Sequence, residues 1–238
     1  MKLSRSLIMV GMMALAGLLG VARASNHAVI IQGWLPTEAS CLDWAPEGLD
    51  TLDELWNDCA LMFEHFYNRP AVDSDPSRIH MLWAEGNDYW RQGPRYKPEW
   101  IDSLLHHLTD DTADIPHISA CFESLAAVMD STDTLFCYTW GHGGHDRYMS
   151  RNSSHFSIKV RPIWGNPGNR QSTPLWDTAF ARMADSVTAQ RVFVMQQCHG
   201  GGFIDDLADD RTIMICAGAT GEKTYSCDNM IMRLTHHA

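Results

Sequence analysis

Residues Thr134–Gly144 read TLFCYTWGHGG, and residues Arg191–Gly202 read RVFVMQQCHGGG. Each stretch is a run of β-branched and aromatic residues that ends in glycines, which is typical of a buried strand followed by a sharp turn. In open α/β sheets, chemistry gathers just beyond the carboxyl ends of such strands. His142 follows the first run and Cys198 follows the second, so the two strand ends offer an imidazole and a thiol, the partners that a cysteine nucleophile needs.

Strand and helix patterns alternate along the rest of the chain. Strands are predicted at residues 28–33, 79–84, 134–140, 191–197 and 211–217, and helices at 51–67 and 118–129 and from Thr173-Pro174 onward. Helices between strands imply crossover connections and a mostly parallel sheet that is covered on both faces. The predicted architecture is a single α/β domain with three αβα layers.

The segments between these elements carry weaker signals. Phe156, Ile158 and Val160 alternate with polar residues, which favours a half-exposed strand in a small hairpin. Residues 165–173 are rich in Gly, Pro and Asn and are predicted to be a loop. The polar stretch 85–116 contains a short predicted helix at about 100–108.

The N-terminal residues have the pattern of a secretory signal peptide. Lys2 and Arg5 precede an apolar run from Leu7 to Val21, and Ala22-Arg23-Ala24 supplies a small-x-small cleavage pattern. The sequence therefore predicts a signal peptide at 1–24 and a secreted or periplasmic domain at 25–238. The apolar run is short and interrupted by glycine, so we expect no stable membrane insertion after cleavage.

The acidic balance of the chain limits its partners. The formal net charge is −11, and removal of the basic residues of the signal peptide makes the domain more negative still. Such a charge argues against nucleic acid or an anionic membrane surface as partner. The motifs call for no cofactor.

Seven cysteines are an odd number for an exported chain, so at least one thiol stays free or pairs with another chain. Cys41 with Cys59, or Cys216 with Cys227, could form a disulfide. Two further cysteines, Cys121 and Cys137, lie on apolar faces and are predicted to be core residues. The glycine-rich setting favours Cys198 as the free thiol.

The pairing of Cys198 with His142 gives these residues a chemical interpretation. Glycines after a cysteine let the backbone turn sharply and leave amide N–H groups free to hold an oxyanion. An imidazole beside the thiol can take its proton. Either residue alone would be read as a buried cysteine or a loop histidine, but the two together at strand ends favour catalysis.

The two motifs resemble those of clan CD cysteine peptidases, which include caspases, metacaspases, gingipains and legumains. That family shares one apolar strand that ends in His-Gly and a later one that ends in a polar residue, a small residue, Cys and a glycine-rich turn. His142-Gly143 is similar to the first, and Gln197-Cys198-His199-Gly200 to the second, in the same order along the chain. The legumain branch is nearest.

The resemblance implies a caspase-like fold and an endopeptidase that acts on peptides or proteins. Cys198 would be the nucleophile and His142 the general base and acid, and the backbone amides of Gly143 and Cys198 would form the oxyanion hole. Relatives continue through another helix and strand after the last strand, whereas this sequence stops at Ala238, so the resemblance implies a minimal or truncated C-terminal end.

Three positions depart from the pattern of these relatives. Gly200 stands where many of them carry Ser. Gln197 stands where Ala or Ser usually precedes the cysteine. Legumains carry an Asn just after the first strand that helps to orient the histidine, whereas this chain reads Gln32-Gly33-Trp34 there.

Two other functions are open on the sequence alone. His142, His145 and Asp146 form a His-x-x-His-Asp pattern that could present metal ligands from a loop, as in a metal-dependent hydrolase. A non-catalytic binding module on a caspase-like fold is the second alternative. Four residues are candidates for lining a substrate cleft: Trp34, Trp140, His145 and Trp164.

Overall fold

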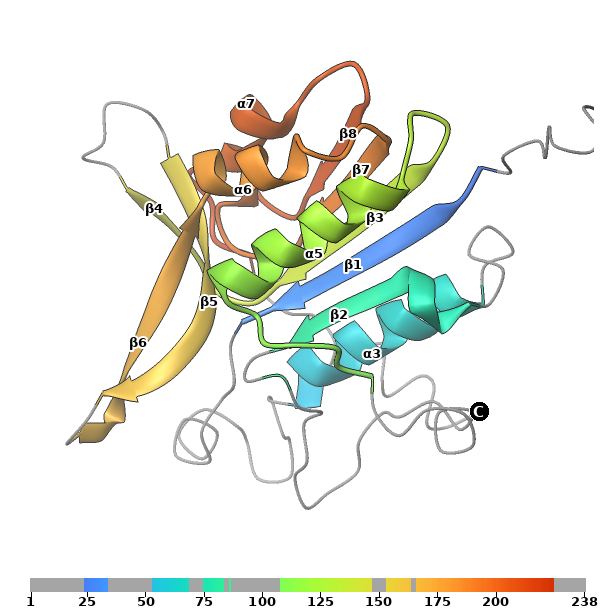
Figure 1. The fold of residues 1–238 in the computed structure, drawn as a ribbon. Coiled ribbons are helices and arrows are strands. Elements are labelled where there is room, and N and C mark those ends of the chain that lie inside the picture. The colour runs from blue at the N-terminus through green and yellow to red at the C-terminus, as the bar shows by residue number, and fades with distance from the viewer. Residues whose placement is uncertain are drawn as a thin grey trace, which may run out of the picture.

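The computed structural model describes residues 24–33, 53–68, 75–83, 86, 108–146, 153–163 and 166–224. A five-stranded sheet forms the centre, with the strand order β2-β1-β3-β7-β8, and every neighbouring pair is parallel (Figure 1). Its strands are β1 (Asn26–Gln32), β2 (Ile79–Trp83), β3 (Thr134–Trp140), β7 (Gln190–Met195) and β8 (Thr212–Cys216). The predicted parallel sheet and its five strands are confirmed, with ends that differ by one or two residues.

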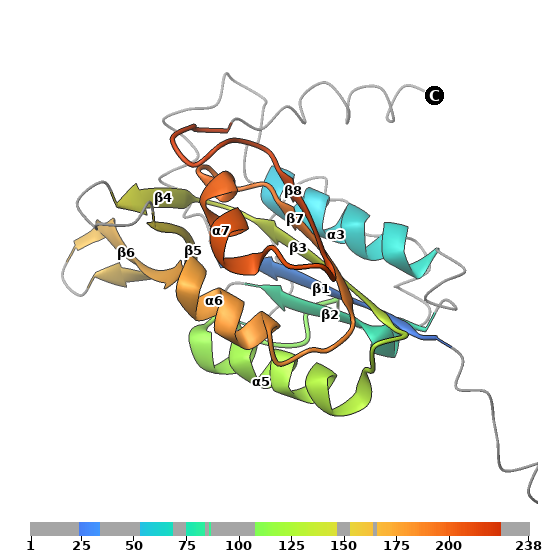
Figure 2. The ribbon, with the colours of Figure 1, turned by 90° about the horizontal axis from the view of Figure 1, so that it is seen from above.

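Helices cover both faces of this sheet. Helix α3 (Asp53–Tyr67) lies on one face, and α5 (Ile115–Val128) and α6 (Asp177–Ala184) lie on the other, which Figure 2 shows from above. The short helix α7 (Ile204–Leu207) contributes Leu207 to the same side as α5 and α6. The molecule is therefore an α/β fold with helix, sheet and helix layers.

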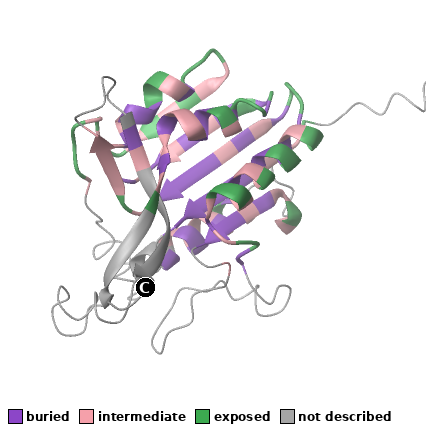
Figure 3. Ribbon diagram, turned by 60° about the vertical axis from the view of Figure 1, so that its left-hand side comes forward, coloured by how far each residue is buried: buried purple, intermediate pink, exposed green. Residues whose placement is uncertain are grey.

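Alternate side chains of the strands supply two separate cores. On β1, Val29 and Ile31 face α5 and α6, whereas Ala28 and Ile30 face α3, as expected for successive residues of a strand. All four are fully buried, and buried residues make up most of β1, β2 and β3 (Figure 3). This burial explains why the runs of these strands are largely apolar. The edge strand β8 differs, because none of its residues is buried and Ile213 and Ile215 are 60% and 54% exposed.

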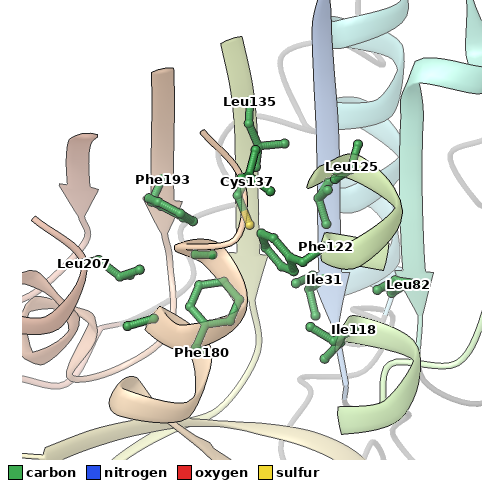
Figure 4. Close-up of a cluster of buried hydrophobic side chains, with 14 of the residues drawn as sticks. Ile31, Leu82, Ile118, Phe122, Leu125, Leu135, Cys137, Phe180, Phe193 and Leu207 are labelled. Atoms are coloured by element: carbon green, nitrogen blue, oxygen red, sulfur yellow. The ribbon is translucent and has the colours of Figure 1, made fainter. Parts of the chain in front are cut away.

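Aromatic rings fill the core beneath α5 and α6 (Figure 4). Phe180 of α6 packs edge-on against Phe122 of α5, with ring centroids 5.5 Å apart, and against Phe193 of β7 at 5.8 Å. Cys137 lies in the same cluster and is buried, so its prediction as a core residue is confirmed. Cys121 packs against this cluster while partly buried.

A second, antiparallel sheet of three strands lies beside the first and corrects two predictions. Its order is β4 (Gly143–Asp146), β5 (Ser153–Ile163) and β6 (Asn166–Trp176). The loop expected at 165–173 is thus mostly strand, and the helix expected from Thr173-Pro174 begins only at Asp177. Strand β6 is an edge strand, and an edge strand tolerates prolines because one of its sides makes no ladder hydrogen bonds.

Helix α5 begins where a side chain caps its first turn. Asp114 accepts a hydrogen bond from the backbone amide of His117 at 3.1 Å, and a proline follows in the first turn, so α5 starts three residues earlier than predicted. A 3-10 turn, η2 (Pro76–Arg78), precedes β2. The short helix expected at 100–108 lies almost wholly outside the described residues, as does the predicted signal peptide. In the described part of the chain, no helix has the length and apolar character needed to cross a bilayer.

Cys59 and Cys216, each proposed as one half of a disulfide, are free thiols, and their proposed partners Cys41 and Cys227 lie outside the described residues. Cys59 belongs to α3 and is fully buried against the sheet, and this burial raises its pKa far above the usual range. Cys216 lies at the end of β8 with its Sγ 3.5 Å from the carbonyl oxygen of Gly200. The free thiols among the described residues are Cys59, Cys121, Cys137, Cys198 and Cys216.

Two histidines at the amino ends of β1 and β2 make the fold sensitive to acid. The rings of His27 and His80 are stacked with centroids 6.0 Å apart, and burial lowers the pKa of both imidazoles below the usual value of 6.5. The unfolded chain therefore binds protons at a higher pH than the folded chain. We expect the free energy of unfolding to be maximal above pH 6.5 and to fall as the pH drops through the lowered values. Denaturant titrations between pH 7.5 and 5 measure this free energy. Its decrease with falling pH should be smaller in His80→Gln, and equal decreases in the two proteins would show that the pair does not contribute.

Candidate functional site

Strands β3 and β7 are neighbours in the central sheet and end at the same edge. Their last paired residues are Thr139 and Met195, and the amide of Gln196 then donates a hydrogen bond to the carbonyl oxygen of Thr139 at 2.9 Å. Beyond this point the chain leaves β3 toward His142 and leaves β7 toward Cys198. The two motifs of the sequence are thus side by side at the carboxyl edge of the sheet.

The backbones of the two turns touch at Gly143. A Cβ atom added to Gly143 would overlap the carbonyl oxygen of Cys198 and would lie 2.9 Å from its carbonyl carbon. Only glycine permits this approach, because its neighbours there are backbone atoms that cannot rotate away. Residue 142 is therefore one position from direct contact with the residue that carries the thiol.

His142 is exposed at this edge of the sheet. The protein around it removes part of the hydration of its ring, and this desolvation lowers the pKa of His142 below the usual value. An imidazole with a lowered pKa is neutral at pH 7. It can therefore accept a proton from a neighbouring group.

The amide of Gln32 lies beside the turn that carries His142. Gln32 ends β1, is fully buried and is paired in register with Trp140. Gly141 has φ +127°, a backbone conformation that favours glycine, and a Cβ atom on it would lie 3.7 Å from Nε2 of Gln32. Neither Oε1 nor Nε2 of Gln32 has a hydrogen-bond partner in the described structure. A buried amide without partners costs free energy, so its place beside the site calls for a functional explanation.

Cys198 is partly buried, and its sulfur lies against Thr224. The backbone amide of Thr224 donates to Sγ at 3.3 Å, and the thiol lies 3.5 Å from the carbonyl oxygen of the same residue. The hydroxyl of Thr224 donates in turn to the carbonyl oxygen of Gln196 at 3.0 Å. Thr224 thereby fixes the sulfur relative to the end of β7.

The loop after β8 holds the turn that follows Cys198. His199 has φ 62°, the left-handed conformation that few residues with side chains adopt. Its amide donates to the carbonyl oxygen of Glu222, and its Nδ1 donates to that of Thr220, both at 2.8 Å. Gly200–Phe203 then form the 3-10 turn η3, and the amide of Gly201 donates to the carbonyl oxygen of Gly218 at 2.9 Å.

His145 is brought to the site by strand β4. Its ring stacks on that of His199, with centroids 5.8 Å apart and an interplanar angle of 25°. The segment was expected to be a loop, but His145 and Asp146 belong to a strand that pairs with β5. His145 therefore links the second sheet to the turn that carries Cys198.

This geometry does not support the metal-binding alternative. His145 and Asp146 are successive residues of a strand and point to opposite sides of the sheet, so they cannot both converge with His142 on one ion in this conformation. Within the described ranges, no three His, Cys, Asp or Glu side chains are grouped so that they could hold a metal ion.

The tryptophans proposed to line a cleft are placed only in part. Trp140 is 9% exposed and belongs to the core beneath α3, and its Nε1 has no hydrogen-bond partner in the described structure. Trp34 and Trp164 lie outside the described residues. Cleft-lining roles for all three stay predictions.

Two residues beside the candidate site, Gln32 and Thr224, are not predicted as site residues from the sequence. Gln32 carries a weak signal, since it is a polar residue that ends an otherwise apolar strand. Thr224 carries none, because only the folding back of the loop after β8 brings it to the sulfur. Compared with known proteins, the chain matches no protein-family model and no curated protein sequence, so the residues themselves have to support any function.

Proposed function

We propose that the chain is an exported cysteine endopeptidase with a caspase-like fold, in which Cys198 and His142 form the catalytic dyad. The observation that carries the proposal is the backbone contact between Gly143 and Cys198, which brings the histidine turn and the cysteine turn together at one sheet edge. That edge is where parallel α/β sheets collect their chemistry. The accessible, neutral imidazole and the partly buried thiol suit their proposed roles.

The proposed reaction is acyl transfer to sulfur. His142 accepts the proton of the Cys198 thiol, and Sγ attacks the carbonyl carbon of the scissile peptide bond. The negative charge that develops on the carbonyl oxygen is held by the backbone amides of Gly143 and Cys198. The C–N bond then breaks, His142 gives its proton to the leaving amine, and water hydrolyses the thioester to release the acid and the free thiol.

Gln32 and Thr224 support the dyad from either side. The buried amide of Gln32 stands next to Gly141 and can orient the turn that presents His142. Thr224 binds the sulfur through its backbone amide and so limits the directions from which Sγ can attack. Both are positioning residues in this proposal, since neither would contact the substrate carbonyl.

The test is hydrolysis of a peptide library with varied residues before the scissile bond. We expect Cys198→Ala and His142→Ala each to lower kcat/KM on the order of 10,000-fold or more, as loss of a catalytic nucleophile or base does. Cys216→Ala is the matched control, because this second partly buried thiol lies behind the same glycine turn and should be dispensable. A thiol alkylator should abolish activity and a chelator should leave it unchanged.

Two outcomes would overturn this assignment. Hydrolysis that survives both alkylation and Cys198→Ala would exclude the thiol as nucleophile. Loss of activity on chelation, with recovery on addition of a divalent metal, would favour the metal-dependent hydrolase instead.

A further inference from the structure

Gln197, the residue before the proposed nucleophile, is completely buried. It follows β7 at the point where the chain turns toward Cys198, and its exposed fraction is 0%. Its Oε1 accepts a hydrogen bond from Oγ1 of Thr139 at 2.7 Å, and Thr139 is buried to the same degree. Both side chains lie inside the protein, so neither interacts with solvent.

This side-chain bond continues the β3–β7 pairing beyond its last backbone contact. The backbone ladder ends with the amide of Gln196 bound to the carbonyl oxygen of Thr139. The hydrogen bond between Thr139 and Gln197 joins β3 to the residue that follows Gln196. Beyond it the two segments diverge, one toward His142 and the other toward Cys198. It is therefore the last described connection between the two strands before the proposed catalytic residues.

Gln197 also contacts the glycine that follows His142. Its Cγ lies 3.0 Å from the position that a Cβ atom on Gly143 would take. Thr139 precedes His142 by three residues and Gly143 follows it directly, so Gln197 touches the chain on both sides of the histidine. One side chain thus spans the gap between the two turns.

The amide of Gln197 is costly to bury, which argues against a purely structural role. Its Nε2 is buried and has no hydrogen-bond partner in the described residues. A methionine of similar length would fill the same space without an unpaired donor. A residue that lowers stability in this way at a proposed active site is expected to serve function.

We propose that the hydrogen bond between Thr139 and Gln197 sets the separation of the His142 and Cys198 turns, so that both are positioning residues for the dyad. This inference rests on the proposed function. A displacement of about 1 Å between reacting groups lowers rates on the order of 100-fold. A hydrogen bond that sets the spacing of the two strand ends should therefore affect kcat more than it affects substrate binding.

The test compares Thr139→Val, Gln197→Met and the double variant. Thr139→Val leaves Oε1 of Gln197 without its partner and should lower the unfolding temperature. Gln197→Met removes the unpaired Nε2 but leaves Oγ1 of Thr139 unpaired, so its unfolding temperature should change little. The double variant replaces both partners by apolar groups and should recover the loss of Thr139→Val. We expect kcat to fall about 10-fold or more in all three, with KM changed less than about threefold. In the double variant the unfolding temperature then recovers while kcat stays low. A bond that serves only stability would let both recover together.

Thr134→Val is the matched control, because it makes the same change at the opposite end of β3 and should leave kcat unchanged. The rate at which iodoacetamide alkylates Cys198, followed by mass spectrometry as a function of pH, is a second readout that needs no peptidase activity. We expect the pH dependence of the alkylation rate in Thr139→Val to become more similar to that in His142→Ala.

The outcomes separate the two proposals. If the alkylation profile of His142→Ala equals that of the unmodified protein, the dyad itself is wrong. If His142→Ala changes the profile while Thr139→Val and Gln197→Met leave it and kcat unaltered, the dyad stands and the positioning role is overturned. Recovery of kcat together with stability in the double variant also overturns it.

Discussion

Replacement of Gly143 by alanine is expected to lower kcat/KM on the order of 100-fold or more. The added methyl group would overlap the carbonyl oxygen of Cys198 and would lie 3.0 Å from Cγ of Gln197. The carbonyl belongs to the backbone, so the conflict is relieved only if β4 or the turn at Cys198 moves. A movement of about 1 Å at a reacting centre is enough for a loss of this size.

The variant should nevertheless remain folded. Overpacking by one methyl group destabilises proteins by about 1–3 kcal/mol, which leaves most domains of this size folded at room temperature. Thermal unfolding and circular dichroism check that the variant is folded. The alkylation rate of Cys198 reports on the displaced turn even where no peptide is cleaved.

Gly221→Ala is the control for this variant. Gly221 lies in the loop that holds the turn after Cys198, but a Cβ atom there would have no neighbour within 4 Å. It should therefore keep full activity and stability. If Gly143→Ala behaved like Gly221→Ala, the two turns would be further apart than the structure places them, and the argument for the dyad would lose its main support.

The strands of the central sheet could be predicted from sequence because their runs are apolar, although only the inner strands β1 and β3 are buried along most of their length. A run such as Val192–Met195 has no polar residue to accommodate, and the glycines after it end the strand sharply. The same reasoning failed for β6, where Pro167, Gly168 and Pro174 occur in an edge strand that a local pattern cannot distinguish from a loop.

The site could be predicted only as far as residues that carry a chemical signal of their own. Cys198 and His142 stand out because glycines flank them. The contacts of Gln32, Gln197 and Thr224 depend on which segments meet in the folded protein, and the spacing of these residues along the chain does not reveal which segments do. Gln32 and Gln197 share one clue: each is a glutamine that follows an apolar run, and both are fully buried, which is uncommon for glutamine.

Arg191 at the start of β7 is another residue whose role the sequence hides. Its side chain is 1% exposed and joins three segments. Nη1 donates to Asp185 after α6 at 2.9 Å, Nη2 to Asp209 before β8 at 2.7 Å, and Nε to Oγ1 of Thr212 at 3.1 Å. Burial, which would raise the pKa of Asp209, is outweighed by hydrogen bonds from Thr212, Arg211 and Arg191, so the pKa of that carboxyl lies well below its usual range.

Arg191→Met is therefore expected to lower the free energy of unfolding by about 3 kcal/mol. Removal of a buried ion-pair partner usually costs about 3–5 kcal/mol, and the lower end applies because the side chains of Asp185 and Asp209 are 60% and 32% exposed and regain water. Arg211 is the matched control, since it binds the same carboxylate at 3.1 Å but is 35% exposed. Arg211→Met should cost less than about 1 kcal/mol. Thermal unfolding should show a decrease of about 6–12 °C for the first variant and little for the second, and equal decreases would mean that burial of the Arg191 guanidinium is not what stabilises the β7–β8 edge.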